Sequence, residues 1–239
     1  MKRFFGKKAV IEAFKQNSLS EIYYTSYFEE LNMLKESSVK INKVNRSFFN
    51  KFDVNHQYIM GISNDQSISI ENDLDIFISK IPYKNKGEKS IILVLDEIQD
   101  PGNFGAICRT CKAFGVDGVI FKKNNQIQIN ETVIKTSLGT ANYLNFLKVS
   151  NILDVIKKLK RIGYWSICGS LNEKSVSLLK LKTNIEKIIL IVGNESKGVS
   201  ELIQKDSDFL VKIDMTDSVQ SLNVSSSTAI LLHYLRYCI

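Results

Sequence analysis

The chain has 239 residues, 44% of them hydrophobic, which is enough to bury one sizeable core or one core and a small second domain. Its net charge of +7 and pI near 9.1 favour a polyanionic partner, usually nucleic acid, although lysines that merely solvate a surface give the same balance. Four cysteines without a disulfide framework, no signal-peptide core and no apolar membrane span together favour a cytoplasmic protein.

Residues 1–65 are expected to form a compact α/β unit. Hydrophobic periodicity predicts helices over 6–16 and 28–37 and strands over 21–25 and 58–63. Basic residues gather at its start and again over 40–51, where Phe48, Phe49 and Phe52 lie among or beside them. Basic side chains bind phosphates and exposed aromatic rings stack on unpaired bases, so the pattern suits an RNA-binding unit. Phenylalanines of an ordinary hydrophobic core would give the same pattern.

Residues 66–90 are expected to form a linker, because they are polar and charged apart from a helix-like stretch over 74–80. Beyond it, over 91–239, apolar strands alternate with helical stretches. The strands are predicted at 91–95, 118–121, 164–168, 188–192 and 209–213, and the helices at 103–114, 130–138, 151–161, 199–205 and 225–237. Such alternation predicts an α/β fold with a mainly parallel sheet covered on both faces.

Three segments of this second domain share one pattern, an apolar strand followed by a polar turn. They end in Asp-Pro-Gly-Asn-Phe-Gly-Ala-Ile-Cys-Arg-Thr (100–110), in Ile-Val-Gly-Asn-Glu-Ser-Lys-Gly (191–198) and in Ile-Asp-Met-Thr-Asp-Ser-Val-Gln-Ser-Leu-Asn (213–223). Open α/β sheets hold their ligands at the carboxyl ends of their strands. Each of the three turns is therefore a candidate binding element.

In these positions the chain resembles the SpoU/TrmH-type RNA ribose 2′-O-methyltransferases of the SPOUT superfamily, whose motifs 1, 2 and 3 the three segments match in order. The likeness covers nearly the whole chain, because residues 1–65 also resemble the small substrate-binding domain of the ribosomal-RNA members. The chain departs from motif 3 at Asp214 and Asp217, where the family usually has proline and glycine.

The resemblance implies a fold, a cofactor and a set of site residues. It implies a C-terminal trefoil knot within 91–239, preceded by an L30e-like small domain, and a homodimer packed at the knot. It implies S-adenosylmethionine as the cofactor, with contacts from Gly193, Ile213, Met215 and Leu222. It assigns the catalytic site to Arg109, Asn103, Glu195, Ser221 and Asn223.

A ribose 2′-hydroxyl is a poor nucleophile, so its methylation needs proton removal, charge stabilisation and alignment. For Arg109 we favour electrostatic stabilisation, because a guanidinium almost never deprotonates; the other interpretation is a surface arginine. Glu195 could instead stabilise the N-terminus of a helix. Asn103, Ser221 and Asn223 could be no more than helix caps.

Other classes of site fit the sequence less well. The turn at 193–198 is Gly-x-Glu-x-x-Gly, which is not the dinucleotide-binding fingerprint. Cys108 and Cys111 lack a second Cys or His pair at ligand spacing, so we expect them to pack in a helix and expect no metal site. The resemblance and the residues together predict methyl transfer to a ribose 2′-hydroxyl of structured RNA, with a guanosine of 23S rRNA as the preferred target. The alternatives are a tRNA 2′-O-methyltransferase and a non-catalytic RNA-binding protein.

Overall fold

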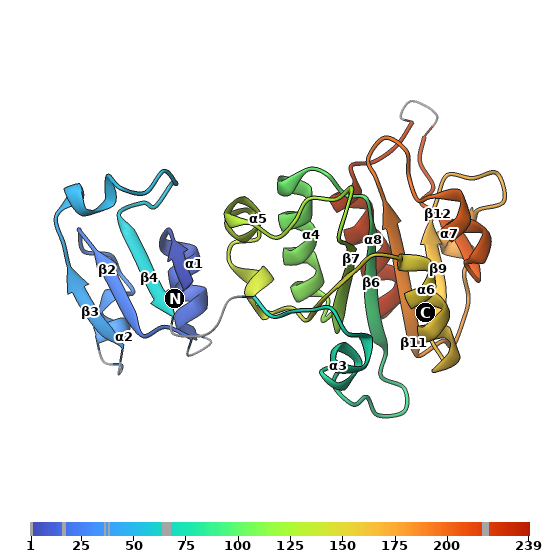
Figure 1. Ribbon diagram of the computed structural model, residues 1–239, viewed down its shortest axis with the longest axis horizontal. Helices are drawn as coiled ribbons and strands as arrows, with labels where there is room; N and C mark the ends of the chain where they lie inside the picture. The colour runs from blue at the N-terminus through green and yellow to red at the C-terminus, as the bar shows by residue number, and fades with distance from the viewer. Residues whose placement is uncertain (1, 16–17, 36, 38, 64–67, 217–219) are drawn as a thin grey trace.

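The computed structural model describes residues 2–15, 18–35, 37, 39–63, 68–216 and 220–239, which form a small N-terminal unit and a larger C-terminal unit (Figure 1). The small unit has a four-stranded sheet in the order β1-β4-β2-β3. Its strands are β1 (Lys2–Phe5), β2 (Glu21–Tyr24), β3 (Lys40–Lys43) and β4 (Ile59–Ser63). The helices α1 (Lys7–Lys15) and α2 (Leu31–Lys35) pack with this sheet around one core.

The large unit is built on an eight-stranded sheet in which neighbouring strands are parallel throughout. The strand order is β10-β12-β9-β11-β6-β7-β8-β5. In chain order the strands are β5 (Ile70–Glu71), β6 (Ser90–Asp96), β7 (Gly118–Lys122), β8 (Phe146–Val149), β9 (Trp165–Gly169), β10 (Val176–Ser177), β11 (Lys187–Gly193) and β12 (Phe209–Lys212). The parallel α/β sheet predicted from the alternation of strands and helices is confirmed.

Helices cover both faces of this sheet, because its central strands bury side chains on both sides. Along β6, residues 91, 93 and 95 point into one core and residues 92 and 94 into the other, which is the period of two that a strand imposes. The first core is closed by α4 (Pro101–Ala113), α5 (Glu131–Thr136) and α8 (Val224–Tyr237). The second is closed by α3 (Leu74–Ser79), α6 (Ile152–Arg161) and α7 (Glu201–Asp206). Short 3₁₀ turns lie at Arg46–Phe49, Thr140–Tyr143 and Leu178–Lys180.

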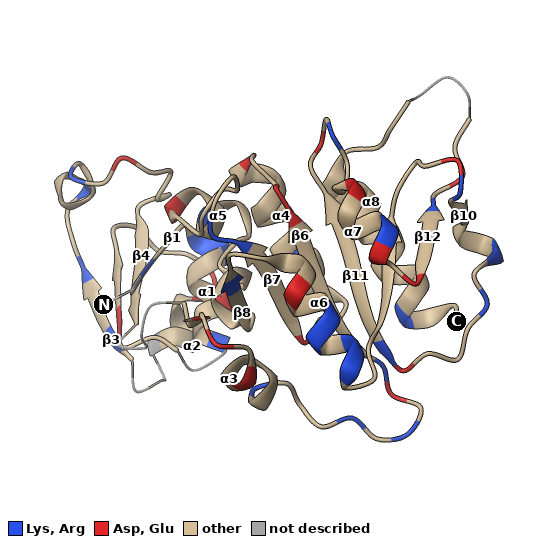
Figure 2. Ribbon diagram, turned by 45° about the vertical axis from the view of Figure 1, so that its right-hand side comes forward, with Lys and Arg blue, Asp and Glu red and all other residues tan. Residues whose placement is uncertain are grey.

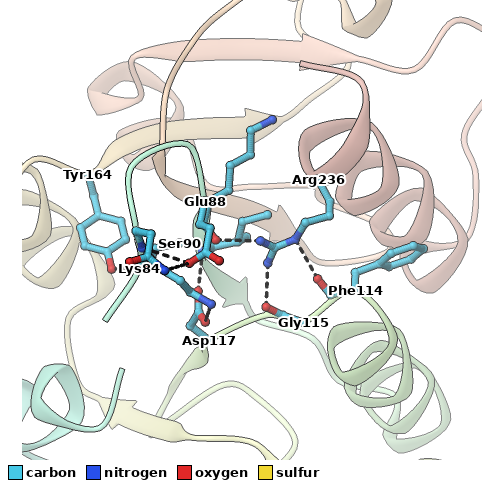
Figure 3. Close-up of polar contacts among 11 residues, drawn as sticks. Lys84, Glu88, Ser90, Phe114, Gly115, Asp117, Tyr164 and Arg236 are labelled. Carbon is cyan, nitrogen blue, oxygen red and sulfur yellow. Dashed lines mark hydrogen bonds and ion pairs between the residues drawn. The ribbon is translucent and has the colours of Figure 1, made fainter. Parts of the chain in front are cut away.

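Arg236 fixes the C-terminal end of α8 to the rest of the large unit (Figure 3). Its guanidinium donates hydrogen bonds to the carbonyl oxygens of Phe114, Gly115 and Lys89, over 3.0, 2.6 and 2.7 Å. Phe114 is the C-cap of α4, and the last carbonyls of a helix have no partner within it. The contact therefore holds α8 beside α4, and the opposite ends of both helices lie at the site described below.

The segment 66–90 is more structured than the linker that we expected. β5 adds an edge strand to the large sheet by pairing with β8, and Phe77 of α3 is fully buried against Gly118. Both elements therefore belong to the large unit. The helix-like stretch expected over 74–80 corresponds to α3, whereas the two residues of β5 are too few to leave a periodicity in the sequence. For the same reason the sequence patterns miss β1, β3, β8 and β10, none longer than four residues. The boundary expected near residue 66 lies outside the described residues.

Lys and Arg residues occur on both units, including along α6 (Figure 2). Within the described parts of the chain, no helix combines the length and the apolarity needed to cross a bilayer.

Candidate functional site

An open cavity of about 650 Å³ lies at the carboxyl ends of β9, β11 and β12. Its walls come from these strand ends, from the loop 194–198, from residues 213, 215 and 220–222, and from α8. The four residues assigned to the cofactor all line it, and two assigned catalytic residues do as well: Gly193, Ile213, Met215, Leu222, Glu195 and Ser221. This volume, and a position at the strand ends of a parallel sheet, are usual for a small-molecule site.

The helix α4 begins beside this cavity with a well-capped turn. Asp100 is its N-cap, and the Asp100 carboxylate accepts a hydrogen bond from the backbone N–H of Asn103 over 2.7 Å. Pro101 occupies the first helical position, where a missing N–H is tolerated. The interpretation of Asn103 as the helix cap is therefore wrong, and its side-chain amide points to other partners.

The loop after β11 is a tight turn that requires glycine at its base. A Cβ at Gly193 would lie 2.3 Å from the carbonyl carbon of Gly198, and Gly198 has φ +69°. The backbones of Asn194 and Gly198 exchange hydrogen bonds of 3.1 and 2.9 Å. The side chain of Asn194 accepts from two N–H groups inside the loop and donates to the carbonyl of Glu97 over 2.9 Å. The loop is thereby closed on itself and attached to the end of β6.

Asn103 joins the three motifs in one hydrogen-bonded group. Its Nδ2 donates to Oε1 of Glu195 over 2.9 Å, and its Oδ1 accepts from Nδ2 of Asn223 over 2.9 Å. Asn223 is also the N-cap of α8, because its Oδ1 accepts from the N–H of Ser225 over 2.8 Å. Asn223 thus caps its helix and holds Asn103 at the same time. Glu195 accepts this bond from a residue in the first turn of α4.

A charge network supports the end of β6 near this loop. Lys122 forms ion pairs with Asp96 over 2.7 Å and with Glu97 over 2.9 Å. Asp96 is 1% exposed and also accepts from the N–H of Ser200 over 2.8 Å. Burial is the largest single effect and lowers the pKa of Lys122, but the hydrogen bonds to Asp96 and Glu97 and the negative charges of these carboxylates together raise this pKa above its ordinary value. A charged Lys122 therefore fixes Glu97, whose φ of +64° few residues with a side chain adopt.

Within a single chain, the assigned catalytic residue Arg109 lies away from the group formed by Asn103, Glu195 and Asn223. It is exposed on α4, six residues beyond Asn103, which corresponds to about 9 Å along the helix axis and to a different face. It does not line the cavity, and its guanidinium has no hydrogen-bond or ion-pair partner among the described residues. Ser221 does line the cavity. The fold therefore brings Asn103, Glu195 and Asn223 together and leaves Arg109 on the neighbouring surface.

Sequence reasoning missed residues that hold the site in place. Asn194 closes the loop, and Glu97 and Lys122 support it from the ends of β6 and β7. An asparagine directly after a strand-ending glycine favours a side-chain-stabilised turn, so Asn194 could have been found. Lys122 gave no such signal, because Glu97 is 25 residues away in sequence and meets it only in the folded sheet.

Cys108 and Cys111 pack in the core between α4 and the sheet, as expected. Both side chains are fully buried, and burial raises the pKa of both thiols. Burial also raises the pKa of Cys168 to about 12. The three thiols are therefore protonated and unreactive at neutral pH. Over the described residues there is no group of three or more His, Cys, Asp or Glu side chains that could hold a metal ion.

Comparison with known proteins assigns the chain to a family. The model of the SpoU rRNA methylase family matches residues 90–233. The chain belongs to this family. A relative, an uncharacterized tRNA/rRNA methyltransferase of Mycoplasma genitalium, is 44% identical over 180 residues, which cover 75% of this chain and 72% of that protein. This SpoU protein is therefore an RNA methyltransferase, as the three motifs predict.

Solved structures of SpoU-type proteins share its fold. The AdoMet-bound rRNA methyltransferase from Sinorhizobium meliloti has a TM-score of 0.73 at 22% identity, with 99% of this chain and 87% of that chain covered. The A. aeolicus TrmH/SpoU tRNA modifying enzyme has a TM-score of 0.56 at 31% identity, with 63% of this chain and 76% of that chain covered. The small unit of this SpoU protein thus has a structural counterpart in the S. meliloti protein.

Proposed function

We propose that the chain transfers a methyl group from S-adenosylmethionine to a ribose 2′-hydroxyl in structured RNA. The observation that carries the proposal is the hydrogen-bonded group Asn103, Glu195 and Asn223 beside the cavity. These residues come from motifs 1, 2 and 3, and the cavity that Glu195 lines is also lined by all four residues assigned to the cofactor.

The cavity suits S-adenosylmethionine in size and chemistry. Apolar side chains such as Val192, Leu222 and Leu231 give it walls suited to a flat base. Residues 193–201 and 169–172 add hydroxyl, amide and backbone groups suited to a ribose and an amino-acid moiety. When bound, the cofactor supplies an electrophilic methyl group. Gly193 would let it approach the backbone, because this strand end carries no side chain.

The chain's own residues would lower the barrier to reaction of the ribose hydroxyl. Arg109 keeps its proton, so its role is to stabilise the negative charge that develops on the 2′-oxygen. The proton then needs another acceptor, and a phosphate of the RNA substrate can serve. Asn103 and Asn223 hold each other and Glu195, which keeps the loop 194–198 aligned with the start of α4.

As the substrate we propose 23S rRNA, with a guanosine as the target. The small unit supports this choice, because the S. meliloti rRNA methyltransferase covers 99% of the chain and the A. aeolicus tRNA modifying enzyme covers 63%. The small unit would recruit RNA through its basic residues, and the large unit would carry out the transfer. The base preference rests on the resemblance of the motifs.

We also propose that two copies of the chain pack through α8. In proteins of this family, α8 corresponds to the helix at the knot. Ile230 and Tyr237 of α8 are 42% and 65% exposed. Tyr237 and His233 make ring contacts with Phe114 at the end of α4, so an aromatic surface spans the two helices. Apolar side chains gathered on one surface are typical of a subunit interface.

The proposal is tested by incubating the protein with methyl-labelled S-adenosylmethionine and separated ribosomal and transfer RNA. We expect label in 23S rRNA, on the ribose of a guanosine. Label in tRNA would mean that the substrate is tRNA, and the proposed reaction would still hold. Label on a base, or no label in either RNA despite cofactor binding, would overturn the proposed reaction.

A further inference from the structure

The loop 55–58 of the small unit holds two adjacent residues in the left-handed region. Gln57 has φ +47° and Tyr58 has φ +55°. Residues with a side chain rarely adopt this conformation, and bulky ones are outliers there. Such conformations persist where the surrounding structure enforces them, and they cluster at functional sites.

The side chain of Gln57 makes a hydrogen bond that holds it in this conformation, whereas the hydrogen bonds of Tyr58 use only its backbone. Oε1 of Gln57 accepts a hydrogen bond from the backbone N–H of Lys7 over 2.9 Å, at the first residue of α1. Tyr58 uses its backbone N–H to bond Nδ1 of His56 and its carbonyl to bond the N–H of Thr25. A glycine would make the same two bonds. The hydroxyl of Tyr58 makes no hydrogen bond among the described residues, and the residue is 41% exposed.

The ring of Tyr58 stands on an aromatic support. It meets Phe49 edge to face at 6.0 Å between centroids and His56 at 4.9 Å. Phe49 is fully buried, so the support is anchored in the core of the unit. The guanidinium of Arg46 lies 5.1 Å from the centre of the Tyr58 ring. Arg46 is exposed, and no carboxylate lies within ion-pair distance of it in the described parts of the chain.

The phenylalanines that the sequence suggested for stacking are already engaged. Phe49 is buried, and Phe48 stacks on Tyr23 at 5.1 Å with an interplanar angle of 9°. The Lys51 ammonium lies 4.1 Å from the ring centre of Phe48 and 5.2 Å from that of Phe52. These rings therefore serve the packing of the small unit, whereas Tyr58 stands at its surface.

We propose that Tyr58 and Arg46 form a stacking site for an unpaired base of the RNA substrate. The inference rests on the proposed function and adds a recognition site to it. Aromatic rings and guanidinium planes are the groups on which proteins stack splayed-out bases. The sequence between residues 40 and 58 carries four cations and one carboxylate, which suits the flanking phosphates. Bases inside a duplex would not reach this site.

The test uses the full-length protein and a short labelled RNA of mixed sequence, single-stranded or in a perfect duplex. Tyr58→Gly should weaken single-strand binding about tenfold or more and leave duplex binding within about twofold. Tyr58→Phe should bind like the wild type. Arg46→Lys keeps the charge but loses the plane, so it should weaken single-strand binding without changing the salt dependence. Tyr27→Gly removes another exposed tyrosine of the same unit and is the matched control.

Measuring the folding stability of Tyr58→Gly shows whether Tyr58 binds RNA or only supports the fold. Because φ +55° suits glycine, Tyr58→Gly should unfold at the same temperature as the wild type or a higher one. Weaker RNA binding together with a lower unfolding temperature would make Tyr58 a structural residue and overturn the proposal, as would wild-type affinity in Tyr58→Gly. Methyl transfer and cofactor binding by the wild type show whether the stacking site alone or also the proposed methyltransferase function is wrong. If both occur while Tyr58→Gly binds normally, only the stacking site fails; if neither occurs, the proposed function fails with it.

Discussion

At the scale of single residues, the side chain of Asn103 connects segments that lie 92 and 120 residues away in sequence. It donates to Glu195 and accepts from Asn223, so it uses both functions of a carboxamide. A carboxylate can replace only the accepting half, and an alanine can replace neither. The requirement for an amide at this position is therefore specific.

We expect Asn103→Asp to impair methyl transfer more than Asn103→Ala. The new carboxylate would face Glu195 at hydrogen-bond distance, and two like charges repel, whereas alanine only removes the contacts. Steady-state kinetics at neutral pH should show a loss of about a hundredfold or more for the aspartate. Equal activity of Asn103→Asp and the wild type would show that the three-residue group does not serve the reaction.

Arg109→Ala should leave the Kd for S-adenosylmethionine nearly unchanged and lower the methylation rate by at least about a hundredfold, because the charge acts in the transition state. The side chain lies outside the cavity of its own chain, and its charge is needed only as the 2′-oxygen becomes negative, so cofactor binding should be spared. Calorimetric titration and single-turnover assays measure the two effects. Arg161→Ala, which removes an exposed arginine on α6, is the control. Near wild-type turnover would remove Arg109 from the mechanism.

At the scale of elements, the turn after β11 depends on support from β6 and β7. Lys122 forms ion pairs with the buried carboxylate of Asp96 and with Glu97. The backbone carbonyl of Glu97 in turn accepts a hydrogen bond from the side chain of Asn194, which holds the turn. Lys122→Met should therefore cost about 3–5 kcal/mol of folding free energy, because Asp96 is left as an unpaired buried charge. It should also weaken cofactor binding. Lys123→Met, next in sequence and exposed, should do neither.

The contribution of the Lys122 ion pairs to the free energy of unfolding depends on pH, because the pKa of Lys122 is raised. A group whose pKa is higher in the folded state stabilises fully below its unfolded pKa, which is about 10.4 for lysine, and loses its effect as the pH rises through the folded value. The difference in unfolding free energy between wild type and Lys122→Met should thus be constant around neutral pH and shrink only above about pH 10. Urea denaturation across this range measures it. A difference that already disappears near pH 8 would contradict the ion-pair explanation.

Most helices and strands could be predicted from the sequence, but the short strands β1, β3, β5, β8 and β10 could not. β6 and β11 have seven residues each and are apolar because both faces are covered, so their positions and the turns after them were visible. The helix α3 was predicted, but its place in the large unit, like that of β5, was not, because it depends on pairing with β8 and on the fit of Phe77 against Gly118. The motif turns were found because each follows an apolar strand. The supports of those turns were not, because ion pairs between strands leave no local pattern.

At the scale of the whole molecule, the two units should separate cofactor binding from RNA recruitment. A shortened chain that starts at Ile68 keeps β5 and α3, whereas one that starts at Lys84 loses Phe77, a fully buried side chain worth about 3–5 kcal/mol. The first should fold and bind S-adenosylmethionine like the full chain, and the second should be less stable. Without the small unit, RNA affinity should fall and its dependence on salt should be less steep, because fewer phosphates are neutralised. Equal slopes and affinities would remove the small unit from RNA recruitment and the rRNA preference with it.

The last prediction concerns how Arg109 reaches the cavity. Within one chain it is exposed and lies apart from the cavity, on a helix that packs beside α8, the element proposed for the homodimer. We therefore expect the second copy to bring Arg109 of one subunit to the cavity of the other. Gly193→Ala should disable the cavity of its own chain, because the added Cβ would lie 2.3 Å from Gly198.

Mixing two inactive variants tests this arrangement. If Arg109 acts across the interface, a dimer of Arg109→Ala with Gly193→Ala has one complete site, made from the intact cavity of the first and the intact arginine of the second. Random pairing would then restore about a quarter of wild-type activity. Each variant alone should remain inactive, and sedimentation should show dimers for both. A mixture with no recovered activity, in which exchange of subunits is demonstrated, would place Arg109 and the cavity in the same chain.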